Sequence, residues 1–383
     1  MKVRLGDYIQ EYSVRNKLDE DIPVYSVTNS KGFCQDYFGK EVASKDKSTY
    51  KIVPQGCFAY NPSRINVGSV DWQRNRDRVI VSPLYNVFSV SPDLDQQYLY
   101  YYLKSDITLH FIKEIATGSV RDNLRLEMLY EFPINLPGLG MQRQIVARLD
   151  MLSNIIGLYK EQLDQLDTLI KARFVEMFRD PKINNKGWAT AVVGDYFNVK
   201  GGKRIPKGMG YASEITNHPY LRASDMKNET IIDDDIHYIS DEVFHKIKNY
   251  TVAAGDIYLT NVGVNLGMCG VIPDKYNGAN LTENAVKLVP KTEKVIDGKF
   301  LALYINSPGI QEYINERKMA VGVPKLAIFR IETMPLLLPP LKLQNEFVTF
   351  VRQVDKSKFY EKALARHTDN KRQEWVICQT LSS

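Results

Sequence analysis

One short stretch, GCFAYNPSRINVG from Gly56 to Gly68, holds residue types that could do chemistry on a nucleic acid. It places Asn-Pro directly after an aromatic residue, Tyr60. Asn, two prolines and an aromatic residue form the catalytic turn of enzymes that methylate exocyclic amino groups of DNA bases. Here the second proline and the stacking aromatic residue are missing, and no glycine-rich turn after a strand is present to hold S-adenosylmethionine. The stretch is therefore not a methyltransferase site.

The other reactive residue types give no catalytic or metal-binding set. The four cysteines are scattered without a Cys-x-x-Cys pair, which indicates neither a zinc site nor a disulfide framework. His237 beside Asp233–Asp235 is interpreted as a solvated acidic turn. A nuclease site could combine Asp274 with Glu316 and Lys318, but the spacing is long and the second part falls in a predicted helix. With no Ser-His-Asp or Cys-His set either, the sequence favours a binding protein.

Size and charge agree with that interpretation. The 383 residues are enough for two or more domains, and the 44% hydrophobic and 25% charged fractions are those of a globular protein. A net charge of +5 permits a polyanionic partner without requiring one. No run approaches the roughly 18 apolar residues of a membrane span, and the N-terminus lacks the apolar core of a signal peptide. We expect a cytoplasmic protein.

The chain contains an internal repeat. LGDY, which ends at Tyr8, returns as VGDY, which ends at Tyr196. The stretch 56–68 returns as GDIYLTNVGVNLG at 255–267, with equal length and the same glycines at its two ends. Asn61-Pro62 is replaced by Thr-Asn in the second copy, which is a further reason to exclude catalysis there.

The later parts of the two copies align with one constant offset of 202 residues. QYLYYYLKS, ending at Ser105, matches KFLALYINS, ending at Ser307. LEMLYEFPINLPGLGMQRQI matches IFRIETMPLLLPPLKLQNEF in the same register, which aligns Gln142 with Gln344. Two separate blocks in one register indicate a duplication.

Each copy has the same predicted order of elements. A part rich in Val, Ile, Tyr, Gly and Pro reads as twisted β structure and is followed by a short helix, residues 98–115 in the first copy, whose tyrosines are interpreted as core. A proline-bounded strand then leads into a long helix. The fold class is therefore α+β, with two repeated β-rich domains separated by long helices. The predicted boundaries are 1–137 and 182–338 for the β-rich domains, and 138–181 and 339–383 for the helical regions.

The first long helix carries a coiled-coil pattern. Its apolar residues recur in alternating steps of four and three over nearly four heptads. These seam positions are Ile145, Leu149, Leu152, Ile156, Tyr159, Leu163, Leu166 and Ile170. A seam needs a partner, and we expect the second long helix to supply it in antiparallel orientation.

The second helix keeps this seam only at its start, at Phe347, Val351 and Val354. The next equivalent positions are polar: Lys358, Glu361, Thr368 and Arg372. We therefore expect a shortened or altered second helix, or a shift of register through Phe359 and Leu364.

The repeated glycine-bounded stretch and a basic loop are the candidate DNA contacts. A polar, amide-rich tip on a rigid sheet suits contacts to base edges or phosphates, and the alternative is a hairpin with Asn and Gly in turn positions. GGKRIPKG at 201–208 suits close approach to phosphates, and the alternative is a solvated loop. The candidate residues are Asn61, Arg64, Asn66, Arg74, Arg76, Ser119 and Arg121 in the first copy, and Lys203, Arg204, Lys207, Arg222, Asn261 and Asn265 in the second.

Two stretches resemble a known family. LDTLIKARFVEMFRDP, residues 166–181, resembles the central conserved helix of the specificity subunits of type I restriction–modification systems. GGKRIPKG and the following PYLRASDM resemble one type of their target recognition domains. The resemblance covers essentially the whole chain.

The resemblance implies a DNA reader that is not itself an enzyme. Each target recognition domain would read one half of a split, asymmetric target in double-stranded DNA, and the antiparallel helices would set the spacer and dock two modification subunits. The chain itself would bind no cofactor, since S-adenosylmethionine, Mg and ATP belong to the modification subunits and to restriction subunits that can join them. A helix of about 35 residues is about 50 Å long, or about one and a half turns of B-DNA.

Two other interpretations stay open at the level of sequence. One is a coiled-coil adaptor whose β-rich domains bind protein, and the other is a self-sufficient DNA methyltransferase or nuclease. Binding that weakens steeply with salt would separate a DNA reader from an adaptor, because phosphate contacts release counterions.

Overall fold

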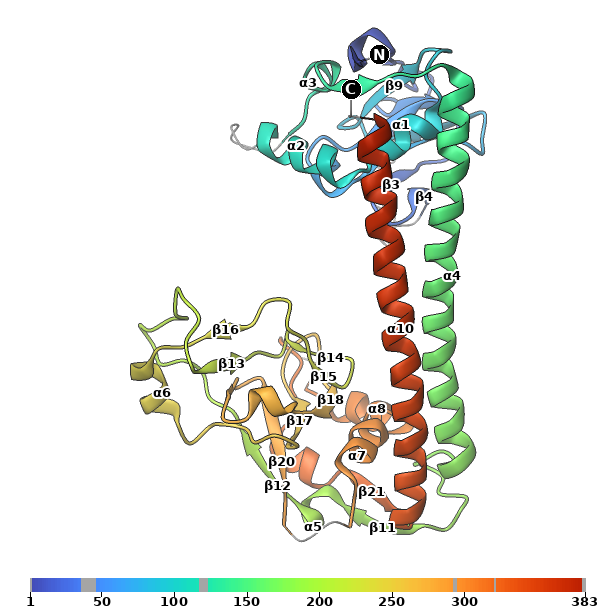
Figure 1. The fold of residues 1–383 in the computed structure, drawn as a ribbon. Coiled ribbons are helices and arrows are strands. Elements are labelled where there is room, and N and C mark those ends of the chain that lie inside the picture. Colours follow the sequence, from blue (N-terminus) through green and yellow to red (C-terminus); the bar gives the residue numbers. More distant parts are fainter. Residues whose placement is uncertain (1, 36–45, 117–122, 292–294, 320–321, 381–383) are drawn as a thin grey trace. The chain divides into compact units, whose positions relative to one another are not determined.

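The computed structural model describes residues 2–35, 46–116, 123–291, 295–319 and 322–380 (Figure 1). The chain divides into two compact units, residues 1–163 with 360–383, and residues 164–359. Each unit combines one β-rich copy with a part of each long helix. The four segment boundaries given by the sequence remain a prediction.

Unit 1 is built on a four-stranded antiparallel sheet in the order β2-β9-β6-β7. The other strands among the described residues of this unit form three antiparallel pairs, β1–β10, β3–β4 and β5–β8. The strands are β1 (Lys2–Arg4), β2 (Ile9–Glu11), β3 (Ser26–Thr28), β4 (Gly32–Cys34), β5 (Lys51–Pro54), β6 (Phe58–Tyr60), β7 (Val70–Trp72), β8 (Arg78–Val81), β9 (Asn86–Val90) and β10 (Pro133–Asn135). The helices are α1 (Gln96–Leu103), α2 (Asp106–Ala116) and α3 (Leu126–Tyr130), with 3-10 turns η1 (Leu5–Asp7) and η2 (Ile65–Val67).

Unit 2 repeats this plan with the order β12-β20-β17-β18 and the pair β11–β21. It also has a three-stranded sheet, β16-β13-β19, and the pair β14–β15. The strands are β11 (Ala189–Val192), β12 (Phe197–Gly201), β13 (Pro219–Leu221), β14 (Met226–Lys227), β15 (Thr230–Ile231), β16 (His237–Tyr238), β17 (Ile257–Thr260), β18 (Cys269–Val271), β19 (Asn280–Leu281), β20 (Ala285–Pro290) and β21 (Pro335–Leu338). The helices are α5 (Val193–Tyr196), α6 (Asp241–Ile247), α7 (Gly298–Ile305), α8 (Pro308–Arg317) and α9 (Ile328–Glu332), with the 3-10 turn η3 (Asp274–Tyr276).

The shared strand order confirms the duplication, and details of the backbone agree with it. Gly56 and Gly255 have φ of +82° and +83° before the central strands β6 and β17. Gly68 and Gly267, which close the two following loops, are also left-handed, at +83° and +95°. Such angles favour glycine, which explains why both copies keep it at the two ends of this stretch.

The tyrosine-rich segment packs into the core, as predicted, but it forms two helices rather than one. Tyr98 and Tyr102 of α1 are buried in the same cluster as Phe58 and Phe88, whose rings stack 5.1 Å apart. The break between α1 and α2 lies at Ser105, whose hydroxyl accepts a hydrogen bond from the Thr108 amide at 3.3 Å. A serine that caps the backbone in this way favours a new helix start over continuation.

The long helices α4 (Leu139–Phe178) and α10 (Leu341–Thr380) pair in antiparallel fashion (Figure 1, green and red). In unit 1, Ile145 and Leu149 of α4 pack in one cluster with Val376 near the end of α10. In unit 2, Phe174 near the end of α4 packs against Phe347 at the start of α10, with ring centres 5.6 Å apart. The predicted seam is confirmed, because all its apolar positions are buried or half-buried.

The second helix is neither shortened nor shifted in register, so these two expectations are wrong, whereas the expectation of an altered helix is confirmed by its polar seam. It has 40 residues, as many as α4, and Phe359 and Leu364 are exposed. Polar contacts replace the apolar seam. Lys358 pairs with Asp167 of α4 at 2.5 Å, and Arg372 donates a hydrogen bond to Ser153 at 3.3 Å. A helix can keep its seam partner when the apolar contact is exchanged for complementary charge and hydrogen bonds.

Equivalent buried glutamines hold the start of each long helix. The side-chain oxygen of Gln142 accepts from the Asp95 amide at 2.8 Å, and its nitrogen donates to the carbonyls of Asp93 (2.9 Å) and Pro137 (2.8 Å). Gln344 makes the same three bonds 202 residues later, with the Asp297 amide and the carbonyls of Val295 and Pro339. Both side chains are fully buried.

Replacing Gln142 with leucine should therefore destabilise unit 1. One amide and two carbonyls in part-buried hydrogen bonds would lose their partner. A fully buried unsatisfied group costs about 1–3 kcal/mol, and water can reach part of this site, so we expect a loss of about 2–4 kcal/mol in total. Amide hydrogen exchange of the β2-β9-β6-β7 sheet measures it. Gln144→Leu is the matched control, because Gln144 is exposed on the same helix. Equal effects of the two variants would contradict this role for Gln142.

Candidate nucleic-acid interface

In both copies the loop after the central strand is held by the segment that precedes a short helix. The Leu124 amide donates to the Pro62 carbonyl at 3.1 Å, and the Leu326 amide donates to the Asn261 carbonyl at 2.8 Å. These equivalent bonds connect the loops 61–68 and 260–267 to the segments before α3 and α9. Each loop is thus mounted on a fixed backbone, as a surface that reads DNA requires.

The first-copy loop contains both a turn residue and an exposed cation. The Asn61 side-chain oxygen accepts hydrogen bonds from the amide and the hydroxyl of Ser63, at 3.1 and 2.9 Å. Asn61 therefore stabilises a turn, which was the alternative to a DNA contact at this position. Asn66 is half-buried in η2, whereas Arg64 is exposed. Of these three candidates, Arg64 is the one that can extend toward a ligand. Ser119 and Arg121 lie outside the described residues.

Arg74 serves the internal structure, while Arg76 is exposed. The Arg74 guanidinium donates to the buried Asp71 at 2.7 Å and to Gln97 at 3.1 Å, and it lies 4.4 Å from the centre of the Trp72 ring. Two hydrogen bonds and a cation–π contact fix the side chain in place. A phosphate could reach Arg74 only in competition with these partners.

Lys104, which no sequence pattern singled out, holds the end of the first-copy loop. Its ammonium donates to the Asn29 carbonyl and side-chain oxygen at 2.7 and 2.8 Å, and to the Gly68 carbonyl at 2.8 Å. It therefore ties the turn between β3 and β4 to the loop 61–68. Burial lowers the pKa of Lys104 to about 8.

The basic loop of the second copy is anchored at one end and exposed beyond it. A Cβ on Gly202 would lie 2.0 Å from the Thr282 carbonyl oxygen, so glycine is required for this close approach. Lys203 and Lys207 are exposed, and the Lys203 ammonium lies 5.6 Å from the centre of the Tyr250 ring. Arg204 pairs with Glu283 at 2.6 Å, although the Arg204 side chain is 78% exposed.

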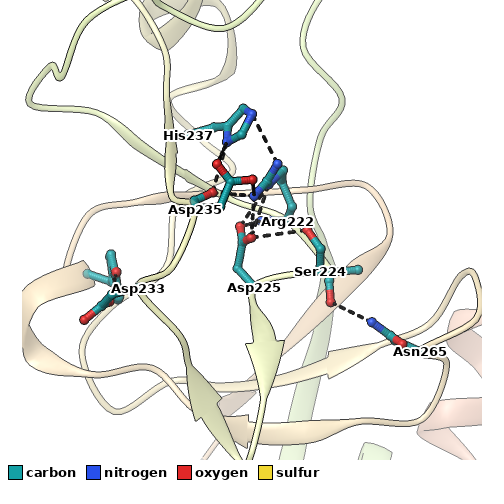
Figure 2. Close-up of polar contacts among 9 residues, drawn as sticks. Arg222, Ser224, Asp225, Asp233, Asp235, His237 and Asn265 are labelled. Atoms are coloured by element: carbon teal, nitrogen blue, oxygen red, sulfur yellow. Dashed lines mark hydrogen bonds and ion pairs between the residues drawn. The ribbon is translucent and has the colours of Figure 1, made fainter. Parts of the chain in front are cut away.

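Arg222 lies in an internal network of polar contacts, which Figure 2 shows. Its guanidinium donates to Asp225 at 2.7 Å and to Asp235 at 3.0 Å, and it lies 3.2 Å from the imidazole Nε2 of His237. These hydrogen bonds raise the pKa of Arg222 and lower the pKa of Asp235. The Asp225 side chain is only 4% exposed, and the Arg222 guanidinium compensates its buried carboxylate. Arg222 thus holds its loop together.

The two asparagines of the second-copy loop also make internal bonds. Asn261 is buried and donates from its side chain to the Leu326 carbonyl at 3.3 Å. Asn265 donates to the Ala223 carbonyl at 3.4 Å, which ties its loop to the Arg222 segment (Figure 2). Both residues position the loop, and Asn261 does not lie on its surface.

The acidic turn around His237 is held by neighbouring side chains. Asp233 pairs with Lys275 and accepts a hydrogen bond from the Tyr276 hydroxyl. Among the described residues, no group of three or more His, Cys, Asp and Glu side chains could hold a metal ion. Within the same residues, none of the helices has the length and apolar character to cross a membrane.

Comparison with known proteins identifies the family. The model of the type I restriction modification DNA specificity domain matches residues 6–168 and 185–365, one match for each copy. The chain therefore belongs to this family, which confirms the resemblance seen in its sequence.

Individual relatives are distant. The chain is 22% identical to the type I restriction enzyme MjaIX specificity subunit of Methanocaldococcus jannaschii over 282 residues, which is 67% of this chain and 61% of that protein. It is 20% identical to the EcoBI specificity subunit of Escherichia coli over 275 residues, 63% of this chain and 54% of that protein. The matches thus span less than two thirds of either relative.

A solved structure supports the fold. The chain superposes with a TM-score of 0.59 on a chain from a study of complex assembly and conformational transition of the type I R-M system. The sequences are 18% identical, and the match covers 99% of this chain and 97% of the other. The predicted fold class, with repeated β-rich domains and antiparallel long helices, is confirmed.

Arg222 and Arg204 should differ sharply in their effect on stability. Arg222→Met would leave the buried Asp225 carboxylate without its cation, which costs about 3 kcal/mol. Arg204→Met removes only an exposed ion pair with Glu283, which water screens, so we expect little change in stability. Chemical denaturation of each variant measures both changes. Similar losses for the two arginines would show that the Arg222 network is not structural.

Proposed function

We propose that this chain is the DNA-recognition subunit of a type I restriction–modification complex. Each β-rich copy reads one part of a bipartite, asymmetric target in double-stranded DNA, and the chain itself performs no catalysis. One observation carries the proposal: within a family of DNA specificity domains, the chain repeats one rigidly mounted loop with different exposed side chains. Two copies of one fold whose loops expose different side chains suit two different half-sites.

The exposed cations support contact with DNA. Arg64 and Arg76 in the first copy, and Lys203 and Lys207 in the second, are exposed on loops that their sheets hold in place. Cations of this kind contact phosphates and set the register on the duplex, whereas base edges carry the sequence information. The internally bonded Arg74 and Arg222 instead give these loops their shape.

The proposal places the reaction on partner subunits. Two modification subunits would supply S-adenosylmethionine and the methyl transfer, and restriction subunits with Mg and ATP could join them. The chain would bind none of these cofactors. Such a complex acts on DNA in the cytoplasm.

An exposed apolar face of α4 suits the docking of a modification subunit. Met151 and Leu158 are exposed and lie seven residues apart, so they share one face of the helix. Paired exposed apolar residues on a long helix are typical of a contact surface.

The function is tested first by mapping DNA methylation in the host with the gene intact and deleted. We expect a split, asymmetric motif with a methylated adenine in each half, and its loss when the gene is deleted. The readout is direct because the proposed subunit decides where the methyl groups are placed. An unchanged methylation map, with the modification subunit expressed, would show that the chain is not its DNA reader.

The docking face has its own test. The double variant Met151→Glu/Leu158→Glu should fail to co-purify with the modification subunit, because two carboxylates cannot be buried unpaired in an apolar contact. Lys160→Glu, on a different face of the same helix, should bind normally. Circular dichroism should show both variants folded. Normal co-purification of the double variant would exclude this face as the docking surface.

A further inference from the structure

The sequences of the two copies differ in residue type in two equivalent segments. The first copy has Arg64 in the loop after β6 and, in the sequence, Arg121 in the segment before α3. In the second copy, Val264 lies one residue after the position equivalent to Arg64, and Val323 aligns with Arg121 through the offset of 202. In the alignment Val323 thus replaces Arg121 and Gly263 replaces Arg64, with Val264 as the next residue.

The two valines lie at one tip of the second copy. The Gly263 amide donates to the Pro324 carbonyl at 2.9 Å, and Val262 pairs with Lys325 in an antiparallel bridge. Val264 follows Gly263 and Val323 precedes Pro324, so each valine is next to a member of the bonded pair. The backbone therefore holds the two side chains on neighbouring segments.

Both valines are exposed to an unusual degree. Val264 is 98% exposed and Val323 is 66% exposed, and Met319, bonded through its backbone to Lys325, is exposed as well. By contrast Ile65, the first-copy equivalent of Val264, is fully buried. One exposed valine needs no explanation, but a group of apolar residues on two short joined segments marks a contact surface.

The backbone around Val264 fixes this outward position. Gly263 has φ of +100° and Gly267 has φ of +95°, conformations that other residues rarely adopt. Thr260 accepts from the Met268 amide at 2.9 Å across the base of the loop. Valine is also stiff at its first side-chain torsion, so little conformational freedom is lost when a ligand binds it.

We propose that Val264 and Val323 read the C5-methyl group of thymine in the half-site bound by the second copy. This inference rests on the proposed DNA-recognition function. Among the base edges in the major groove, the thymine methyl is the apolar feature, and small apolar side chains recognise it. Arginine instead pairs with guanine. The first copy carries arginine in these segments and the second carries valine, so we expect half-sites that differ in their bases.

The test uses the chain in complex with its modification subunits and a duplex that carries the mapped target. Thymines in one half-site at a time are replaced with deoxyuridine, which lacks only the methyl group. For the half-site read by the second copy, we expect affinity to fall about fourfold per methyl contacted, the value of one buried methyl or methylene group. The variant Val264→Ala/Val323→Ala should bind the thymine and deoxyuridine duplexes of that half-site equally.

Val67→Ala is the matched control, because it removes the same atoms from an exposed valine in the first-copy loop. It should leave the discrimination in the second half-site unchanged. Specific binding without any loss on deoxyuridine substitution would overturn the methyl-reading proposal and leave the DNA-recognition function intact. A half-site without thymine on either strand, or a double variant that keeps the discrimination, would overturn it too. Absence of specific binding would instead overturn the recognition function, and the inference with it.

Discussion

The fully buried side-chain amides of Gln142 and Gln344 are the contacts on which the rest of the architecture depends. Each one joins the start of a long helix to the segment that caps a helix of its own domain, α1 or α7. Asp95 and Asp297, whose amides the glutamines bind, in turn cap those helices with their carboxylates. An amide suits this position because it is both donor and acceptor and carries no charge to desolvate. The direction in which each long helix leaves its domain is thereby fixed.

The two long helices stay paired although the contacts between them change from apolar to polar along their length. The contact between Phe174 and Phe347 is aromatic, whereas Lys358 and Arg372 bond to Asp167 and Ser153. Apolar packing supplies most of the pairing energy where it is present, and the polar contacts specify register more than they add stability. The polar second half of α10 is therefore compatible with a complete helix.

The candidate interface separates into side chains that build the loops and side chains that face outward. Arg222, Arg74 and Asn261 are held by internal hydrogen bonds, and a sequence cannot distinguish them from exposed Arg64 or Lys203. An interface that reads bases needs both kinds, because the accuracy of a contact depends on how firmly its support is held. Each of the two copies has such internally bonded residues in its loops, and the exposed side chains of those loops differ between the copies.

The duplication, the α+β class, the helix seam and the family could all be predicted from the amino-acid sequence alone. These features follow from the local periodicity of apolar residues and from the constant offset between the two copies, which aligns Gln142 with Gln344. The length of α10, the break at Ser105 and the role of each arginine became clear from the three-dimensional contacts. Lys104 gave no sequence signal, because its three acceptors come from Asn29 and Gly68, far away along the chain. Whether a polar side chain is hydrogen-bonded within the protein depends on which distant segment packs beside it. The periodicity of the sequence does not show which segments those are.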